Sequence, residues 1–253
     1  MRHDKYLIAL GIDEKISSCT QEMKQKILSL LFEQYQGIFA PERYNYFEPV
    51  NKKFSNPAEL LKNWNDPYFM LKRIKHPKMN FTFDSIFREN LHHKCYYLFV
   101  DIDWKIKSEI IESFFVDMIE MTHPFWAYIS SDIHWLDRTL VKYEDTSSLS
   151  GKKMIYQHHI CRPPSQRLYG IFWRTYLSKT LVDECQWAEK IKNVPCQYQC
   201  LSDGYLLKVY ENCFDNDWNK EEQIINYLGR EYIADIKTYY RENKLQPVDE
   251  RFY

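Results

Sequence analysis

The chain has 253 residues, a formal net charge of −1 and 27% charged residues, so no global field favours binding to DNA or to anionic lipid. Aromatic residues make up 17% of the chain and glycine occurs only 6 times, which excludes disordered, collagen-like and glycine-rich phosphate-binding proteins. A chain of this length can bury roughly three quarters of its unfolded surface, so we expect a large folded core.

The first apolar run, Tyr6 to Ile12, predicts a strand. This run is too short for the apolar region and cleavage site of a signal peptide, and no other segment approaches the length of a membrane span. We therefore expect a cytoplasmic protein without membrane contacts. The seven cysteines are odd in number and irregularly spaced, unlike a secreted disulfide framework, and are typical of reduced, packed thiols: Cys19, Cys95, Cys161, Cys185, Cys196, Cys200 and Cys213.

Two helices are predicted in the first quarter of the chain. Ser18 and Gln21 form a capping-box pattern, and apolar residues then recur at helical spacing up to Pro41. The second helix is predicted to start at Asn56-Pro57, because asparagine is a favourable N-cap and proline suits the first helical position.

The most strongly patterned stretch predicts a central strand followed by a helix. Residues 95–102 are almost all aromatic or aliphatic, which is typical of a strand that is covered on both faces. A helix is expected from Ser108, as its N-cap, with one apolar stripe. Before the central strand, residues 68–74 and 79–83 predict a hairpin that turns at residues 76–78.

In the second half of the chain, the pattern of apolar and polar residues is less regular. Residues 130–167 are polar and poor in helix formers, so we interpret them as a long binding loop. Residues 169–173 then predict a strand, 177–187 a helix, 194–210 a hairpin, and 219–229 a capped helix that stops at a glycine. Together the elements predict an α+β fold, with a mixed or antiparallel central sheet and helices packed on it in a single compact domain over residues 1–253.

One pair of carboxylates is a candidate for catalysis. Asp101 and Asp103 flank Ile102 at the end of the central strand and should project on the same side. Such a pair can bind a divalent ion, so a metal-dependent hydrolase or nuclease is the alternative function. Solvated acids are also common at strand ends, and neither a further acid nor a lysine at nuclease spacing accompanies the pair. We therefore assign no catalytic residue.

Metal and nucleic-acid sites are not favoured either. The repeated motifs His92-His93-Lys-Cys95 and His158-His159-Ile-Cys161 offer zinc ligands, but adjacent side chains on a strand diverge, so we predict no metal or cofactor. A basic cluster lies in the predicted hairpin, where alternation sends its members to different faces and indicates a solvated edge rather than direct contact with nucleic acid: Lys72, Arg73, Lys75 and Lys78.

Short motifs that cover most of the chain carry a family resemblance. In the N-terminal half they are Pro41-Glu-Arg43, Glu48-Pro49, Phe54, Trp64, Leu71-Lys-Arg73 and Pro77. In the C-terminal half they are Tyr169-Gly-Ile-Phe-Trp173, Tyr176-Leu177, Leu181-Val182, Gly204 to Tyr210, Asp215 and Leu228-Gly229. This set resembles the immunity proteins of bacterial polymorphic toxin systems, in particular immunity protein family fifty-two and type VI secretion immunity proteins. The segment from His134 to Arg167 has no counterpart in this resemblance.

The resemblance implies an α+β protein without enzyme activity that is encoded beside a secreted toxin. Such a protein binds and neutralises its cognate toxin by occluding the toxin's active or substrate-binding surface. Because family members are often paired with toxins of a restriction-endonuclease-like fold, a nuclease that acts in the cytoplasm is the first expectation. A homo-oligomeric structural protein, such as a homodimer, is a third possibility.

A stable interface of about 800 Å² per partner needs aromatic or arginine anchors. Two segments combine such anchors with acidic groups that could meet a basic nuclease cleft. In the predicted loop these partner-binding candidates are Trp135, Asp137, Arg138, Tyr143, Glu144 and Asp145, and nearer the C-terminus they are Asp215, Asp217, Trp218 and Glu221.

Overall fold

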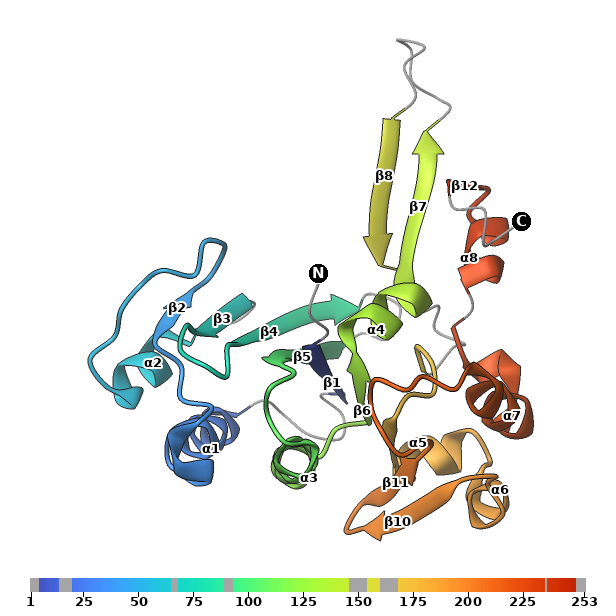
Figure 1. Cartoon of the computed structure of the whole chain (residues 1–253), viewed down its shortest axis with the longest axis horizontal. Coiled ribbons are helices and arrows are strands. Elements are labelled where there is room, and N and C mark those ends of the chain that lie inside the picture. The colour runs from blue at the N-terminus through green and yellow to red at the C-terminus, as the bar shows by residue number, and fades with distance from the viewer. Residues whose placement is uncertain are drawn as a thin grey trace.

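The computed structural model describes residues 5–13, 20–64, 68–88, 93–145, 154–159, 168–234 and 236–248. A nine-stranded antiparallel sheet organises them, in the order β10-β11-β9-β6-β1-β5-β4-β3-β2 (Figure 1). Its strands are β1 (Lys5–Asp13), β2 (Arg43–Asn45), β3 (Tyr68–Arg73), β4 (Met79–Arg88), β5 (His93–Asp103), β6 (Trp126–Ser131), β9 (Arg174–Ser178), β10 (Gln197–Leu201) and β11 (Gly204–Lys208). The predicted α+β class, with an antiparallel sheet and helices packed on it, is confirmed.

The remaining elements are the helices and a second, smaller sheet. The helices are α1 (Gln21–Phe32), α2 (Pro57–Asn63), α3 (Ser108–Thr122), α4 (Asp132–Thr139), α5 (Lys179–Glu184), α6 (Ala188–Lys192), α7 (Trp218–Leu228) and α8 (Ile236–Glu242), with short 3-10 turns η1 (Gln34–Gly37) and η3 (Arg230–Tyr232). The small sheet has the order β12-β7-β8 and consists of β7 (Leu140–Asp145), β8 (Met154–His159) and β12 (Gln246–Pro247). Within the described ranges, no helix combines the length and apolar composition needed to cross a bilayer.

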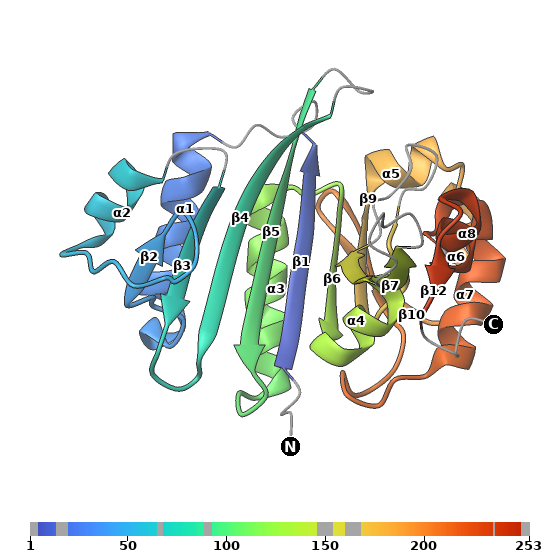
Figure 2. The same cartoon turned by 90° about the horizontal axis from the view of Figure 1, so that it is seen from above.

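The predicted central strand is confirmed as β5, which lies between β1 and β4 (Figure 2). Leu98, Val100 and Ile102 have no exposed surface, and Tyr97 on the other face is 4% exposed. Burial on both faces explains why the sequence of this strand is almost continuously apolar rather than alternating.

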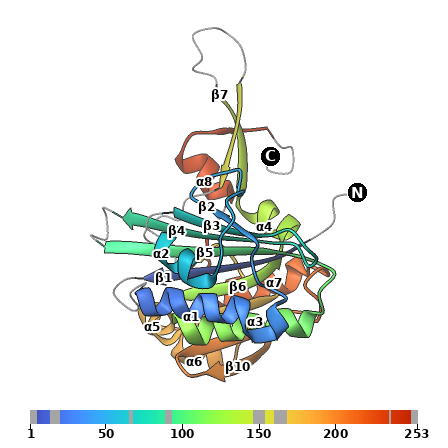
Figure 3. The same cartoon turned by 90° about the vertical axis from the view of Figure 1, so that its left-hand side faces the viewer.

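Helices α1 and α3 cover one face of the sheet, whereas α4 packs on the other (Figures 1 and 3). The apolar stripe predicted for α3 is confirmed, because Ile111, Phe114, Phe115 and Met118 are fully buried. The ring of Phe39, which follows α1, lies 4.3 Å from that of Phe114, so the two helical segments share one core.

The sequence predicts the positions at which helices start more accurately than it predicts the residues that cap them. Asn56 caps α2 as expected, with its side chain accepting from Glu59 N at 2.9 Å. For α1 the cap is Thr20, while Ser18 lies outside the described residues. The prediction that Ser108 caps α3 is wrong, because Lys107 occupies that position and its side chain makes no cap bond.

Aromatic rings fill the face of the sheet on which α4 packs. Trp126 and Tyr128 of β6 stack at 5.1 Å, and Trp135 of α4 lies 5.2 Å from Tyr128. Gly11 of β1 pairs with Trp126, and a Cβ at this position would lie 2.5 Å from the indole. The absence of a side chain at residue 11 therefore makes room for the tryptophan.

The prediction of a long loop over residues 130–167 is wrong where the structure describes this segment, at residues 130–145 and 154–159. Its described parts form the end of β6, helix α4 and the strands β7 and β8, which project away from the large sheet as a hairpin (Figure 1). The pattern was missed because α4 has only eight residues and β8 is exposed at Ile155, Tyr156 and Gln157, so neither has a full apolar period.

Further along the chain, the hairpin is confirmed as β10–β11 and the stop of α7 at Gly229 is confirmed by a φ of 129°. Two details differ. Residues 169–173 precede the strand rather than form it, since β9 begins at Arg174. The side chain that caps α7 is Asp217, two residues before the capped helix predicted from residue 219.

Candidate partner-binding site between α4 and α7

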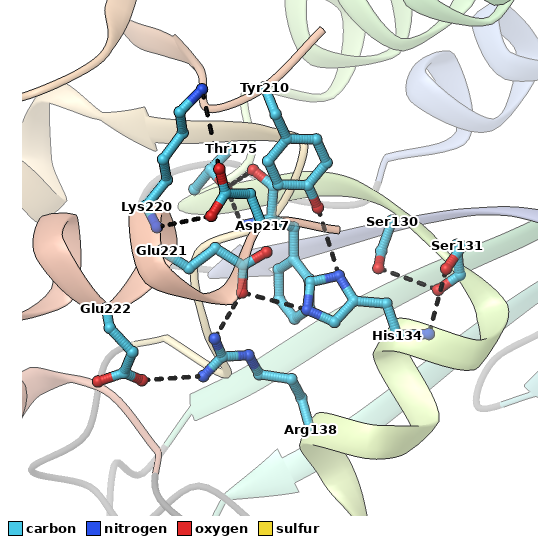
Figure 4. Close-up of polar contacts among 11 residues, drawn as sticks. Ser130, Ser131, His134, Arg138, Thr175, Tyr210, Asp217, Lys220, Glu221 and Glu222 are labelled. Atoms are coloured by element: carbon cyan, nitrogen blue, oxygen red, sulfur yellow. Dashed lines mark hydrogen bonds and ion pairs between the residues drawn. The ribbon is translucent and has the colours of Figure 1, made fainter. Parts of the chain in front are cut away.

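The candidate site joins two helices that are far apart in sequence. Ser131 caps α4 by accepting from His134 N at 3.1 Å, and Asp217 caps α7 by accepting from Lys220 N at 3.1 Å (Figure 4). These caps fix where each helix begins, and therefore which side chains point across the junction.

A buried polar network connects the helices (Figure 4). His134 Nε2 lies 3.1 Å from Glu221 Oε2, and Arg138 Nη2 donates to the same oxygen at 2.5 Å. The side chains of His134 and Glu221 are fully buried, and that of Arg138 is 10% exposed. A carboxylate in this environment needs both donors, because burying an unpaired charge is costly.

Tyr210 completes the network from the segment after β11. Its hydroxyl lies 3.3 Å from His134 Nδ1. Burial first, and then the charge of Glu221, raise the pKa of Tyr210 far above its usual value, so the phenol keeps its proton. Tyr210 therefore joins the network as a protonated phenol beside His134 and Glu221, and the tautomer of His134 sets which group donates in the contact at Nδ1.

This environment predicts loss of stability in alkali. Burial is the main cause that raises the pKa of Tyr210, Tyr176 and Tyr35 above the unfolded value of about 10. The folded state therefore holds these protons more tightly, so this contribution is complete below about pH 10 and falls as the pH rises further. Urea unfolding at a series of alkaline pH values should show the free energy of unfolding decline as the pH rises. In Tyr210→Phe this free energy should fall less steeply with pH. If the free energy of unfolding fell equally steeply with pH in the natural sequence and in Tyr210→Phe, this role of Tyr210 would be contradicted.

An exposed anchor lies directly over the network. Trp218 is 43% exposed, and the Arg138 guanidinium stacks 4.3 Å from the centre of its ring. Beside them is a cavity of about 360 Å³, lined by Asp137, Arg138, Trp218, Glu222, Ile225, Arg230, Ile233, Ala234, Ile236 and Lys237. Glu222 pairs with Arg230 and lies 3.7 Å from Arg138 Nη1. We call Arg138, Trp218 and this cavity the Arg138–Trp218 surface.

The structure brings the two predicted groups together only in part. Asp137, Arg138 and Trp218 line the cavity, Glu221 lies beneath it, and Asp217 caps α7. Sequence reasoning missed His134, Tyr210, Glu222 and Arg230. The four-residue spacing from His134 to Arg138, which places both on one helix face, was the available signal.

Other predicted residues lie elsewhere. Trp135 is only 8% exposed and belongs to the aromatic core, so its assignment as a partner contact is corrected. Tyr143 and Glu144 lie on β7, where they pair with β12, and Asp215 lies in the turn before α7; none of the three lines the cavity. Asp145 pairs with Met154 through its backbone, and its side chain lies outside the described parts.

The alternative carboxylate pair is engaged in other interactions. Asp101 Oδ1 accepts from Lys5 Nζ and Asn80 Nδ2, both at 2.9 Å, and Asp103 Oδ2 lies 2.9 Å from His76 Nδ1. Across the described ranges, no three His, Cys, Asp or Glu side chains are grouped so that they could hold a metal ion. The side chains of both His-His-x-Cys motifs, apart from Cys95, lie outside the described residues.

Comparison with known proteins shows a similarity to a solved structure. No protein-family model and no curated protein matches the chain. Among solved structures, the chain is similar to the Pseudomonas aeruginosa T6SS protein PA0821, with a TM-score of 0.59 and 11% sequence identity, over 91% of this chain and 73% of that one. At this level of identity the similarity shows a shared fold.

Proposed function

We propose that this chain is an immunity protein that binds and neutralises a toxin in the cytoplasm by occluding the toxin's active or substrate-binding surface. The proposal is supported by the sequence motifs that resemble polymorphic-toxin immunity proteins and by the fold shared with a T6SS protein. The first candidate for the toxin is a nuclease, as the resemblance implies. In this role the chain acts by shape and catalyses no reaction.

The Arg138–Trp218 surface is the observation that carries the proposal. Tryptophan and arginine are the residues most enriched at interface hot spots, where they are held rigid beside well-packed pockets. Here the His134–Glu221 network holds Arg138 from beneath, and Arg138 supports the ring of Trp218. Ile225 and Ile233 contribute apolar surface to the lining of the adjacent cavity. Such preorganisation reduces the entropic cost of binding.

The proposal predicts that Trp218→Ala weakens binding of the cognate toxin by at least about 2 kcal/mol, or roughly 30-fold in Kd. The toxin encoded by the neighbouring gene is co-expressed with the chain, and survival, copurification and Kd are measured. Trp104→Ala is the matched control, because Trp104 is also 43% exposed but follows β5 and does not line the cavity. We expect this control to protect as well as the natural sequence.

The possible outcomes distinguish an error in the proposed interface from an error in the proposed function. Equal protection and affinity for the two variants would place the interface elsewhere on the chain. Failure of the natural sequence both to protect cells and to copurify with that toxin would refute the function itself. Light scattering of the free protein would identify a homo-oligomer.

A further inference from the structure

We propose that two copies of this chain pair through the exposed edge of β10, so that the large sheet continues across a two-fold axis at Gln199. This inference does not rest on the proposed function. β10 is the last strand at one end of the nine-stranded sheet, and it lies at the rim of the molecule with no described element beyond it (Figures 1 and 3).

The two ends of the large sheet differ in whether they can accept another strand. At the β2 end, Tyr44 N donates to Lys52 O at 2.9 Å, and Lys52 N donates to Tyr44 O at 3.1 Å. β2 has only three residues and pairs with β3 on its other side, so the loop that contains Lys52 closes this edge. β10 pairs with β11 and has no strand on its outer side. The open end of the sheet is therefore β10.

The hairpin with β11 determines which backbone groups of β10 point outward. Leu201 pairs with Gly204 across a two-residue turn, and in an antiparallel pair the residues that exchange both backbone hydrogen bonds alternate from this closing pair. The N–H and C=O groups of Tyr198 and Cys200 therefore point away from β11. In the parts of the chain that the structure describes, no other group bonds to them. Such groups recognise an extended strand.

A second copy of β10 matches this pattern of outward groups. In an antiparallel pair with its two-fold axis at Gln199, Tyr198 of one copy lies opposite Cys200 of the other, and symmetry repeats the same pair. Each of these pairs exchanges both backbone hydrogen bonds. Every outward N–H and C=O of the two residues therefore gains a partner in the other copy.

The charges around β10 favour antiparallel pairing with a second copy. Charged side chains and prolines usually keep an exposed edge from pairing, and Gln197–Leu201 contain neither. Lys192 precedes the strand and Asp203 follows it, and their side chains are 62% and 58% exposed. Within the chain they pair with Glu189 and His123, which are also exposed. Antiparallel pairing brings the lysine end of one copy to the aspartate end of the other, so opposite charges approach.

The side chains of β10 suit a contact between copies. Residues 197–200 are all exposed, and Tyr198 is 40% exposed. Tyr198 and Cys200 project from one face of the strand, so the ring of one copy would cover the small apolar thiol of the other. On the opposite face, Gln199 would lie directly across from Gln199 of the second copy, where two uncharged amides can form a hydrogen bond.

The length of the edge sets the expected affinity. A five-residue strand buries less than the roughly 800 Å² per partner of a stable complex, so we expect a weak dimer with a Kd of about 10–100 μM. Because the β2 edge is closed, pairing through the large sheet stops at two copies. Sedimentation velocity of the full chain, over concentrations on both sides of this Kd, should therefore show a monomer and a dimer.

Charge substitutions at the two-fold axis test the pairing itself. Gln199→Lys and Gln199→Glu each place two like charges directly opposite each other, so each should raise the Kd for dimerisation by about fivefold. An equimolar mixture of these two variants should form a heterodimer at least as tight as the natural dimer. The matched control is a mixture of Gln197→Lys and Gln197→Glu, because Gln197 is exposed on the same strand but would lie opposite Leu201 of the second copy. This control mixture should gain no affinity over its components.

Three results would overturn the proposal. The first is a natural chain that stays monomeric at every concentration. The second is a dimer that both Gln199 variants leave unchanged, which would place the contact on another surface. The third is a mixture of the Gln199 variants that dimerises no better than either variant alone. Circular dichroism confirms that each variant is folded, and because no toxin is used, none of these results bears on whether the chain is an immunity protein.

Discussion

Glu221→Ala should lower the free energy of unfolding by about 3–5 kcal/mol, since breaking a buried ion pair leaves an uncompensated charge. The substitution removes the acceptor of both His134 and Arg138, and the Arg138 side chain is only 10% exposed. Urea unfolding monitored by circular dichroism measures the loss. We expect a lower midpoint with little change in slope.

Glu222→Ala is the matched control for this experiment. Glu222 is the next residue of α7 and also pairs with arginine, but its side chain is 38% exposed. Surface ion pairs contribute little, so this substitution should cost less than about 1 kcal/mol. If the two variants lost the same stability, the buried network would not be what joins α4 to α7.

Gly11→Ala should cost about 2–3 kcal/mol through overpacking. The added Cβ would lie 2.5 Å from the indole of Trp126, which is 1% exposed and stacked on Tyr128, so the ring has little room to move. Thermal and urea unfolding would measure the effect. The same substitution at Gly170, where the nearest atom is Cζ of Phe172 at 3.1 Å rather than an atom at 2.5 Å, should cost less.

A double-mutant cycle identifies the cause. Trp126→Leu removes the indole, so Gly11→Ala should become much less costly in that background, with a coupling of about 1–3 kcal/mol. If the two changes were additive, the cost at Gly11 would arise in the backbone and not from contact with Trp126.

The buried network links stability to the proposed interface. Arg138 contacts Glu221 beneath the surface and Trp218 on it, so any change that frees Arg138 also removes the support of the exposed ring. Measuring the toxin affinity of Glu221→Ala at a temperature where the variant is folded would separate support of the anchor from stability.

Local patterns determined much of the fold. The apolar run of β5, the turn between β3 and β4, the Asn56 cap of α2 and the Gly229 stop of α7 each depend on neighbours within a few residues, and the sequence predicts all four correctly. The prediction of a loop was wrong over residues 130–145 and 154–159, where short or exposed elements lack a full hydrophobic period.

The functional surface was decided by the tertiary structure. Sequence alone identified Arg138, Trp218 and Glu221 as candidates, yet it treated Arg138 and Glu221, 83 residues apart, as members of separate surfaces. It also could not show that Trp135 is buried. Composition and spacing determine which residues are able to bind, but contact across the sheet and between distant helices depends on how the whole chain packs. That packing alone places a carboxylate beneath an arginine, and the arginine beneath an exposed tryptophan.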